Sequence, residues 1–499
     1  MKPIQVPLNI GSETFKKLLI NSLYKTFGWS FDVCVQKWQE LYDTYLKDMS
    51  PTVSAVIECD YVDKVYRNSY YRYYAAKSHN ISRDCIRLSF FNDANNDLLS
   101  QEMELSKWRS LYSGFLIIRP TTMNLVGRNG LAPFIFIDND FLICKTQIPA
   151  SVNGLKVSVE AFPASSQDCE TMLCAETSVW ALMEYFGNRY AEYTPVLPSQ
   201  IIKHLRNWIP SRQLPSEGLS WEQISFLLKK FNFQPVVFPV GDKVSRNLVV
   251  GSYIESGIPI CLVLNNSNYC NSNPQIEDIA HAVICIGHTK ISEEAINNAV
   301  AEDYGGYSIV DYNDIEKKYV FIDDNFHPYQ MDYLDAPTER YEDEAWKHCE
   351  IELAIVPLYE KILLSPITVK NIATNYILLC GQLQQTEIAM RIFLASSRSY
   401  RDYVCTNDMP ETMKNMILKL RLPKFVWVVE LSDRDLLRKE MAAGLMLFDA
   451  TEPKFENLTA LEMIFYNERA ILISRDSFEP LVYDKVGNSM FHMYNKNLR

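Results

Sequence analysis

The sequence is poor in the features that define several classes of protein. Glycine makes up only 17 of its 499 residues, which excludes a collagen-like repeat. Its 12 cysteines are too few for a scaffold held together by disulfides, and it has no run of about 18 apolar residues that could span a bilayer. The first residues, MKPIQVPLNI, include no apolar segment of signal-peptide length. We therefore expect a soluble, cytoplasmic protein with reduced thiols.

The chain also lacks an excess of positive charge. Its 49 lysines and arginines are outnumbered by 61 aspartates and glutamates, which gives a net charge of −12. A molecule of this charge repels nucleic acid and anionic membranes. At long range it favours a substrate or partner of basic character.

Motifs for metal and nucleotide binding are missing. The sequence contains no CxxC or HExxH motif for zinc, and no GK[ST] or GxGxxG motif for phosphates. We therefore expect neither a metal nor a cofactor. The basic stretch RPTTMNLVGR, with Arg119 and Arg128, could hold an anion, although surface turns account for most such patterns.

The rest of the composition is that of a globular protein, with 47% hydrophobic and 22% charged residues. At about 150 residues per domain, the length predicts three domains. We expect an N-terminal mixed α/β domain at 1–155, a middle domain at 156–358 and a C-terminal α/β domain at 359–499.

The N-terminal part begins with helical periodicity in residues 1–50 and continues with a segment dense in tyrosine, Tyr61–Tyr74. These rings could stack on a ligand, but packing on a neighbouring layer is the more common reason for such a cluster. Short β-like runs separated by glycine and proline follow at 114–120, 132–137, 140–148 and 155–162.

The middle part has helices first and strands afterwards. Apolar spacing predicts helices at 174–187, ended by Gly187, at 198–208 and at 220–231. β-like runs follow at 234–240, 259–264, 281–287, 307–310 and 319–323. This order predicts an α+β fold with an antiparallel sheet. In the C-terminal part we expect helices near 371–396 and 410–420, and strands at 424–431, 444–450 and 469–474.

Cys174 stands at the start of the helix predicted at 174–187. Unsatisfied backbone N–H groups and the helix dipole favour an anion at that position, and the thiolate is the reactive form of cysteine. Gln167 lies upstream at a distance from which its side-chain amide can return to the helix start. There it would donate a hydrogen bond to an oxyanion that develops beside the nucleophile.

A thiolate needs a base, and His281 is the strongest candidate because it opens the apolar strand predicted at 281–287. The run at 319–322 ends in Asp323, Asp324 and Asn325, and a carboxylate there can orient the imidazole. Side chains alternate along a strand, so only one of the two aspartates points toward His281. Asp323 and Asp324 therefore compete for this role.

Other cysteines and histidines are weaker candidates. Cys169 is a rival nucleophile, but Asp168 and Glu170 flank it, and their charge raises its pKa. We interpret His288 and His327 as structural residues, the second of them in a turn.

The series QD-x5-CAETSVWALMEYFG, HAVICIGH and VFIDDN resembles the papain-like cysteine peptidases. It is most similar to the branch that trims double-glycine leader peptides from bacteriocins, and to the uncharacterised bacterial relatives of that branch. The resemblance covers about residues 160–335. It implies a papain-like core, in which the helix that carries the cysteine packs on an antiparallel sheet. It also implies Cys174 as nucleophile, His281 as base, Asp323 as orienting carboxylate and Gln167 as oxyanion donor.

We therefore expect a thiol hydrolase that cleaves a peptide or amide bond in a peptide or protein substrate, with flanking domains that recognise a protein partner. An acyl-transferring enzyme would use the same residues. The alternative is a catalytically inactive sensor or scaffold whose papain-like core binds a peptide or protein partner. Selective labelling of the thiol at pH 6 separates an enzyme from such a scaffold.

Overall fold

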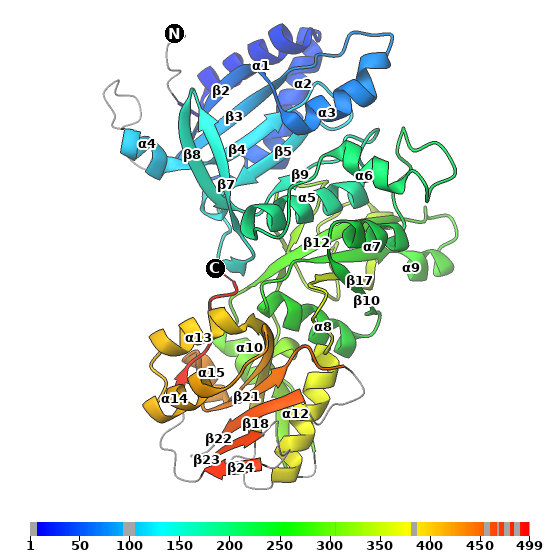
Figure 1. The fold of residues 1–499 in the computed structure, drawn as a ribbon. Helices are drawn as coiled ribbons and strands as arrows, with labels where there is room; N and C mark the ends of the chain where they lie inside the picture. The colour runs from blue at the N-terminus through cyan, green and yellow to red at the C-terminus, as the bar shows by residue number, and fades with distance from the viewer. Residues whose placement is uncertain are drawn as a thin grey trace.

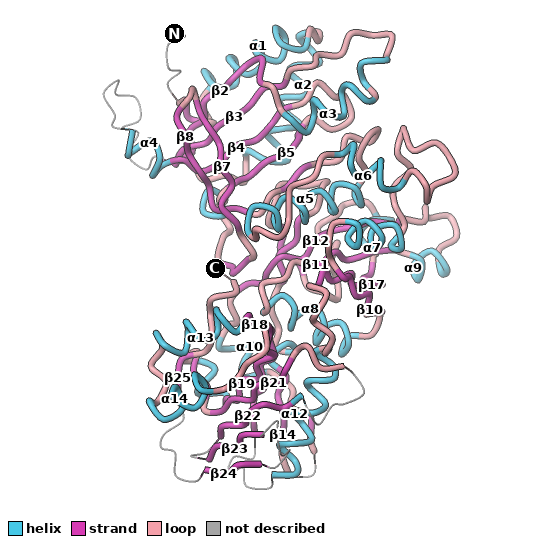
Figure 2. Tube along the Cα trace, viewed as in Figure 1, coloured by secondary structure: helices cyan, strands magenta, loops and turns pink. Residues whose placement is uncertain are grey.

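The computed structural model describes residues 7–92, 105–304, 306–380, 387–453, 460–466, 469–473, 480–483 and 490–498. Three large sheets follow one another along the molecule, each accompanied by helices (Figure 1). Helices and mostly antiparallel strands are mixed throughout (Figure 2), which confirms the predicted α+β class. Across the described ranges, no helix has the length and apolar character needed to cross a membrane. The eleven cysteines whose side chains are described form no disulfide.

The first sheet belongs to the N-terminal part and has the order β1-β2-β3-β4-β5-β9. Its strands are β1 (Leu8–Asn9), β2 (Val53–Tyr61), β3 (Cys85–Asn92), β4 (Tyr112–Ile118), β5 (Val126–Leu131) and β9 (Ala164–Ser165). The hairpin of β7 (Thr146–Val152) and β8 (Leu155–Ala161) lies against β4 and β5. The helices of this part are α1 (Glu13–Phe27), α2 (Phe31–Leu41), a π-helix (Tyr42–Leu46), α3 (Lys64–Arg72) and α4 (Leu105–Leu111).

The tyrosine-rich segment forms α3 and the turn after it. Tyr66 and Tyr74 are buried, with 5.9 Å between their ring centroids, so the rings of this pair pack inside the protein. The run at 132–137 was expected to be a strand, and this prediction is wrong. It forms a 3₁₀-helix at Pro133–Ile135, where the proline has no N–H to give to a ladder. The strands β2 and β3 were not predicted, because β3 is buried along nearly its whole length and shows no alternation.

The second sheet has the order β10-β17-β11-β12-β15-β16, and β6 also pairs with β12. Its strands are β6 (Phe141–Ile143), β10 (Gln234–Pro239), β11 (Ile260–Asn265), β12 (Ala280–Thr289), β15 (Tyr319–Ile322), β16 (Gln330–Asp332) and β17 (Glu350–Leu358). All pairs in this sheet are antiparallel. The central strand β12 therefore carries neighbours on both edges, which fixes the position of its side chains.

Four longer helices accompany the second sheet: α5 (Cys174–Arg189), α6 (Pro198–Leu205), α7 (Trp221–Lys230) and α8 (Lys243–Glu255). The first three were predicted and α8 was not. α5 packs on β12, and Ser178 Oγ lies 3.4 Å from the Ala282 carbonyl oxygen. Gly187 does not end α5, which continues for two residues. A Cβ at Gly187 would lie 2.4 Å from the backbone nitrogen of Pro195, so glycine is needed there for close packing.

The segment between β12 and β15 leaves the second sheet and joins the third. It forms α10 (Glu293–Asn298), β13 (Glu302–Asp303) and β14 (Ser308–Asp311), and β14 pairs in parallel with β18 (Glu387–Ser396). Two strands from before residue 358, the boundary expected between the domains, therefore belong to the third sheet.

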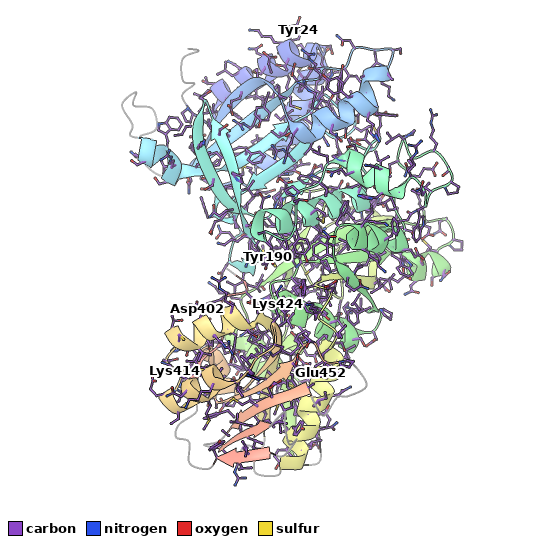
Figure 3. All side chains as sticks on the ribbon, in the orientation of Figure 1. Tyr24, Tyr190, Asp402, Lys414, Lys424 and Glu452 are labelled. Atoms are coloured by element: carbon purple, nitrogen blue, oxygen red, sulfur yellow. The ribbon has the colours of Figure 1, made fainter. Side chains whose placement is uncertain are left out.

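The third sheet has the order β13-β14-β18-β19-β21-β22-β23-β24. Its further strands are β19 (Phe425–Ser432), β21 (Gly444–Asp449), β22 (Leu461–Tyr466), β23 (Arg469–Ile473) and β24 (Pro480–Tyr483). The helices are α12 (Pro366–Cys380), α13 (Ser397–Thr406), α14 (Glu411–Lys419) and α15 (Arg434–Arg438). Asp402 of α13 and Lys414 of α14 lie on the same side of the sheet (Figure 3).

The helical prediction near 371–396 is wrong in its second half. α12 ends at Cys380, residues 381–386 lie outside the described part, and 387–396 is the strand β18. β18 is buried at eight consecutive positions, so its sequence shows a continuous apolar run that does not distinguish a strand from a helix.

Buried ion pairs join the third sheet to the second. Arg391 on β18 lies 2.6 Å from a carboxylate oxygen of Glu255 at the end of α8, and 2.9 Å from one of Glu430. The other oxygen of Glu255 lies 2.7 Å from Nε2 of His288. Burial alone would raise the pKa of Glu255, but Arg391 and His288 hold it well below its usual range. This network supports the interpretation of His288 as a structural residue.

Candidate active site

Cys174 is the first residue of α5. The loop before it is shaped by Asp168, whose carboxylate accepts hydrogen bonds from the backbone N–H groups of Glu170, Thr171 and Met172 at 2.6 to 3.0 Å. Asp168 is buried, which makes these bonds costly to break. The loop therefore holds the Cys174 side chain at the N-terminus of the helix, beside backbone N–H groups that have no partner within the helix.

Glu176 closes the first turn of α5. One carboxylate oxygen accepts a hydrogen bond from the Leu173 backbone N–H at 3.2 Å, and the other accepts one from the Ser216 hydroxyl. Ser216 is held in turn by its backbone N–H, which donates to the Glu170 carbonyl at 2.8 Å. Burial raises the pKa of Glu176. The glutamate thus caps the helix and fixes the loop around residue 216 beside the cysteine.

His281 lies near the start of β12 and is 3% exposed. Its Nε2 atom lies 3.1 Å from Oδ1 of Asp323. Its Nδ1 atom is buried and has no hydrogen-bond partner, and the Cys174 sulfur is close enough to the ring to raise its pKa, so this nitrogen is left to the thiol. Burial alone would lower the pKa of His281, but Asp323 and the Cys174 sulfur raise it well above its ordinary value. The structure therefore brings thiol, imidazole and carboxylate together in that order.

Asp323 follows β15 and is held from several sides. Its second oxygen accepts hydrogen bonds from the Arg340 guanidinium and, at 2.8 Å, from the Tyr341 hydroxyl. Its first oxygen also accepts the Asn325 backbone N–H at 3.1 Å. Burial alone would raise the pKa of Asp323, but His281 and Arg340 hold it well below its usual range. The carboxylate therefore stays ionised and keeps the imidazole in place.

Asp324 is close to the site but differently placed. Its Oδ1 atom lies 3.9 Å from Nε2 of His281, and neither oxygen has a hydrogen-bond partner. Burial raises the pKa of Asp324 to about 7. In the pairing of β12 with β15, Ile284 lies opposite Ile322. Continuing this register places Asp323, and not Asp324, on the same face of the sheet as His281. The geometry therefore favours Asp323 as the orienting residue.

Gln167 reaches the same cluster from the loop before α5. Its Nε2 atom donates a hydrogen bond to Oδ1 of Asn325 at 3.0 Å. Asn325 also donates its own amide to the Tyr341 hydroxyl at 3.0 Å, which in turn donates to Asp323. One amide hydrogen of Gln167 is thus engaged beside the His281–Asp323 pair, and the second is available for an oxyanion.

Trp346 shields the imidazole. Its ring meets that of His281 edge-on at 5.1 Å and stacks on Tyr341 at 5.1 Å, with 13° between the planes. The two rings exclude water from the side of the His281–Asp323 hydrogen bond, which strengthens the electrostatic attraction across it.

Two weaker candidates are placed differently. Cys169 has a left-handed backbone (φ 60°), and burial together with Asp168 and Asp324 raises the pKa of its thiol. This environment disfavours the ionised form of the Cys169 thiol, in the direction expected from the acidic residues that flank it. His327 stacks on Phe136 at 4.8 Å, and its Nδ1 lies 2.8 Å from the Pro328 carbonyl oxygen.

One group of residues has the geometry of a cation site. Among the described residues, His281, Asp323 and Asp324 present ligand atoms that all lie within 4.8 Å of one another. Asp323 is already bound to the Arg340 guanidinium, whose charge opposes a second cation on the same carboxylate. The Cys174 sulfur also acts on the pKa of His281, and a thiol beside an imidazole is an arrangement suited to acid–base chemistry.

A cavity of about 400 Å³ opens beside the N-terminus of α5. Thr171 and Glu176 line one side, and the loop through Gly218 lines another. The far wall comes from α6 and the chain after it, with Ile202 and Trp208 among its apolar residues. Cys174 itself does not line this cavity, which lies on the Glu176 side of the helix start and has room for part of a substrate.

Three residues of the site were not found from the sequence: Arg340, Tyr341 and Trp346. They belong to an irregular segment and the short helix α11 (Glu344–Lys347). Arg340 and Tyr341 reach Asp323, and Trp346 reaches His281, only through the tertiary fold. Arg119, which was considered as an anion-binding residue, is buried, and its guanidinium binds main-chain carbonyls. Arg128 is paired with the buried Asp63.

Comparison of the chain with protein-family models and with curated proteins found no match.

Proposed function

We propose that this chain is a thiol hydrolase that cleaves a peptide or amide bond through Cys174, His281 and Asp323. The observation that carries the proposal is the position of the buried His281 ring. One ring nitrogen is bound to an ionised carboxylate, and the other is left to a thiol at a helix N-terminus. We further propose that α5 packed on the antiparallel second sheet is a papain-like core, as the sequence resemblance implies.

The first half of the reaction forms an acyl-enzyme. The Cys174 thiolate attacks the carbonyl carbon of the substrate, and the carbonyl oxygen becomes an oxyanion that accepts the Cys174 backbone N–H and the Gln167 amide. The carbon–nitrogen bond then breaks, and the His281 imidazolium gives its proton to the departing amine. Asp323 stabilises the imidazolium without taking its proton.

The second half restores the enzyme. His281, now neutral, takes a proton from a water molecule that attacks the thioester carbonyl. The carbon–sulfur bond breaks, the acid leaves, and the thiolate–imidazolium pair forms again. An amine in place of water would complete acyl transfer by the same route. The cavity beside α5 supports a substrate that extends beyond the cleaved bond, as a peptide does.

The proposal is tested by labelling the protein with iodoacetamide at pH 6 and mapping the modified residue by mass spectrometry. A thiolate paired with His281 reacts at this pH, whereas ordinary thiols are protonated and react slowly. We expect one fast modification at Cys174, which is lost in His281→Gln. Cys169→Ala serves as the matched control and should leave the fast modification unchanged.

Absence of fast labelling at Cys174 would contradict the proposal and favour a non-catalytic role. A second readout is the burst of p-nitrophenol from p-nitrophenyl acetate, which is released in an amount equal to the enzyme when the acetyl-enzyme forms faster than it is hydrolysed. Cys174→Ala should abolish the burst while retaining the circular dichroism spectrum of the folded protein.

A further inference from the structure

We propose that Arg119, which follows β4 of the first sheet, is a positioning residue for the oxyanion donor Gln167. This inference rests on the proposed function and extends it, because it makes the N-terminal sheet a working part of the site. Arg119 touches no reacting atom. It acts by holding the backbone from which the Gln167 side chain projects.

The contacts of Arg119 lie on the loop that leads to the cysteine. Its Nη2 atom lies 3.1 Å from the carbonyl oxygen of Ser166, 3.0 Å from that of Gln167 and 2.6 Å from that of Val126. Arg119 is only 5% exposed. In the described part of the chain, every hydrogen-bond acceptor of its guanidinium is a main-chain carbonyl. The guanidinium thus binds the backbone of β5 and of the loop at 166–167. Hydrogen bonds from a charged donor are stronger than those between neutral groups.

The strand β5 provides the space that this arrangement needs. A Cβ at Gly127 would lie 3.0 Å from Cγ and Cδ of Arg119. Glycine at this position lets the arginine side chain lie along β5 and reach the loop at 166–167. A larger residue at 127 would therefore push the Arg119 side chain from its present path.

A second residue of the N-terminal part anchors the partner of Gln167. The Tyr45 hydroxyl lies 2.9 Å from Ser166 Oγ and donates a hydrogen bond to the Phe326 carbonyl at 3.1 Å. Phe326 follows Asn325, whose side-chain oxygen accepts the Gln167 amide. Both ends of the Gln167–Asn325 hydrogen bond are therefore adjacent to residues held by the N-terminal part.

This anchoring matters because glutamine has a long and flexible side chain. The position of its amide depends on where its backbone is fixed, and a misplacement of about 1 Å in a catalytic arrangement can cost on the order of 10²-fold in rate. An oxyanion donor is useful only if it is already in place when the negative charge develops.

The test separates oxyanion formation from thiol reactivity. Acylation by p-nitrophenyl acetate passes through an oxyanion, whereas alkylation by iodoacetamide is a displacement at saturated carbon and forms none. We expect Arg119→Met to lower the burst rate about tenfold or more, by the loss of a well-placed donor. The rate of alkylation at Cys174 should stay within about twofold, because the thiolate–imidazolium pair is untouched.

The double variant Arg119→Met with Gln167→Ala identifies the route. If Arg119 acts through Gln167, the double variant should acylate no more slowly than Gln167→Ala alone. Arg87→Met is the matched control, because Arg87 is equally buried in the first sheet but is bonded to Glu58 and to the Ser151 carbonyl. Arg87→Met should not lower the rate of acylation by more than the rate of alkylation.

Three outcomes would overturn the inference: equal losses of acylation and alkylation, no loss of acylation, or additive losses in the double variant. If Arg119→Met fails to fold, Tyr45→Phe removes only the hydroxyl bonds to Ser166 and Phe326, and should show the same selective loss of acylation. A wild-type protein without a burst and without labelling at Cys174 would instead reject the proposed function, and this inference with it.

Discussion

Nε2 of His281 and Oδ1 of Asp323 lie 3.1 Å apart although 42 residues separate them in the chain. The pairing of β12 with β15 sets this distance. Ile284 lies opposite Ile322, and continuing this register places the side chains of His281 and Asp323 on one face of the sheet. The pair is buried, with His281 3% and Asp323 1% exposed. A buried ion pair depends on pH in a way that can be worked out for each partner.

Asp323→Asn should lower the free energy of unfolding by about 3 to 5 kcal/mol near pH 5, because it leaves buried cations without their carboxylate. The pKa of Asp323 is lowered, so its part of the stability is present above about pH 4 and is lost as the pH falls. The pKa of His281 is raised, so its part is present below about pH 6.5 and is lost as the pH rises. Urea unfolding at pH 3, 5 and 9 should show the largest difference from wild type at pH 5. A difference that is independent of pH would contradict the ion pair.

Asp324→Asn should have the opposite effect on stability. Burial raises the pKa of Asp324 to about 7, so between about pH 4 and pH 7 the folded protein holds a proton that the unfolded chain has released. Wild-type stability therefore falls as the pH rises through this range. The variant avoids that loss, and should match wild type at pH 4 and exceed it by up to about 4 kcal/mol at pH 8. Thermal unfolding at the two pH values measures this, and a variant less stable than wild type at pH 8 would show that the carboxylate has an ionic partner.

The elements that carry the candidate triad could be predicted because their sequence patterns are local. Cys174 precedes an apolar helical face, and His281 and Asp323 stand at the ends of short apolar runs bounded by polar residues. The choice between Asp323 and Asp324 needed the register of two strands, which depends on pairing partners far apart in the chain.

The remaining features depend on contacts that leave no local pattern. Arg340 and Tyr341 lie in a segment without periodicity, and they are recognisable only once β16 and the turns after it return the chain to Asp323. The parallel pair of β14 and β18 joins segments separated by more of the chain than any local signal spans. β18 itself is buried on both faces and so resembles a helix core in sequence.

Gly187→Ala should destabilise the protein although alanine favours helices by about 1 kcal/mol over glycine. The new Cβ would lie 2.4 Å from the backbone nitrogen of Pro195, and neither backbone can move freely because α5 packs on β12. We expect a net loss of about 1 to 3 kcal/mol. Gly241→Ala is the matched control, because a Cβ there meets no atom within 4 Å. Chemical unfolding that shows Gly187→Ala as stable as wild type would mean that the 187–195 contact is looser than in the structure.

Ile202→Trp should narrow the cavity at the N-terminus of α5, and so reduce the cleavage of large substrates more than that of small ones. Ile202 is half-buried and lines the cavity of about 400 Å³ on the side of α6. The burst from p-nitrophenyl acetate should stay within about twofold of wild type, because an acetyl group needs none of this space. Cleavage of a randomised peptide library, mapped by the new N-termini, should lose the sites with bulky residues next to the cut bond. Lys203→Trp, whose side chain is exposed and outside the cavity lining, should leave the cleavage pattern unchanged. If Ile202→Trp also leaves it unchanged, the substrate side chain binds elsewhere along the site.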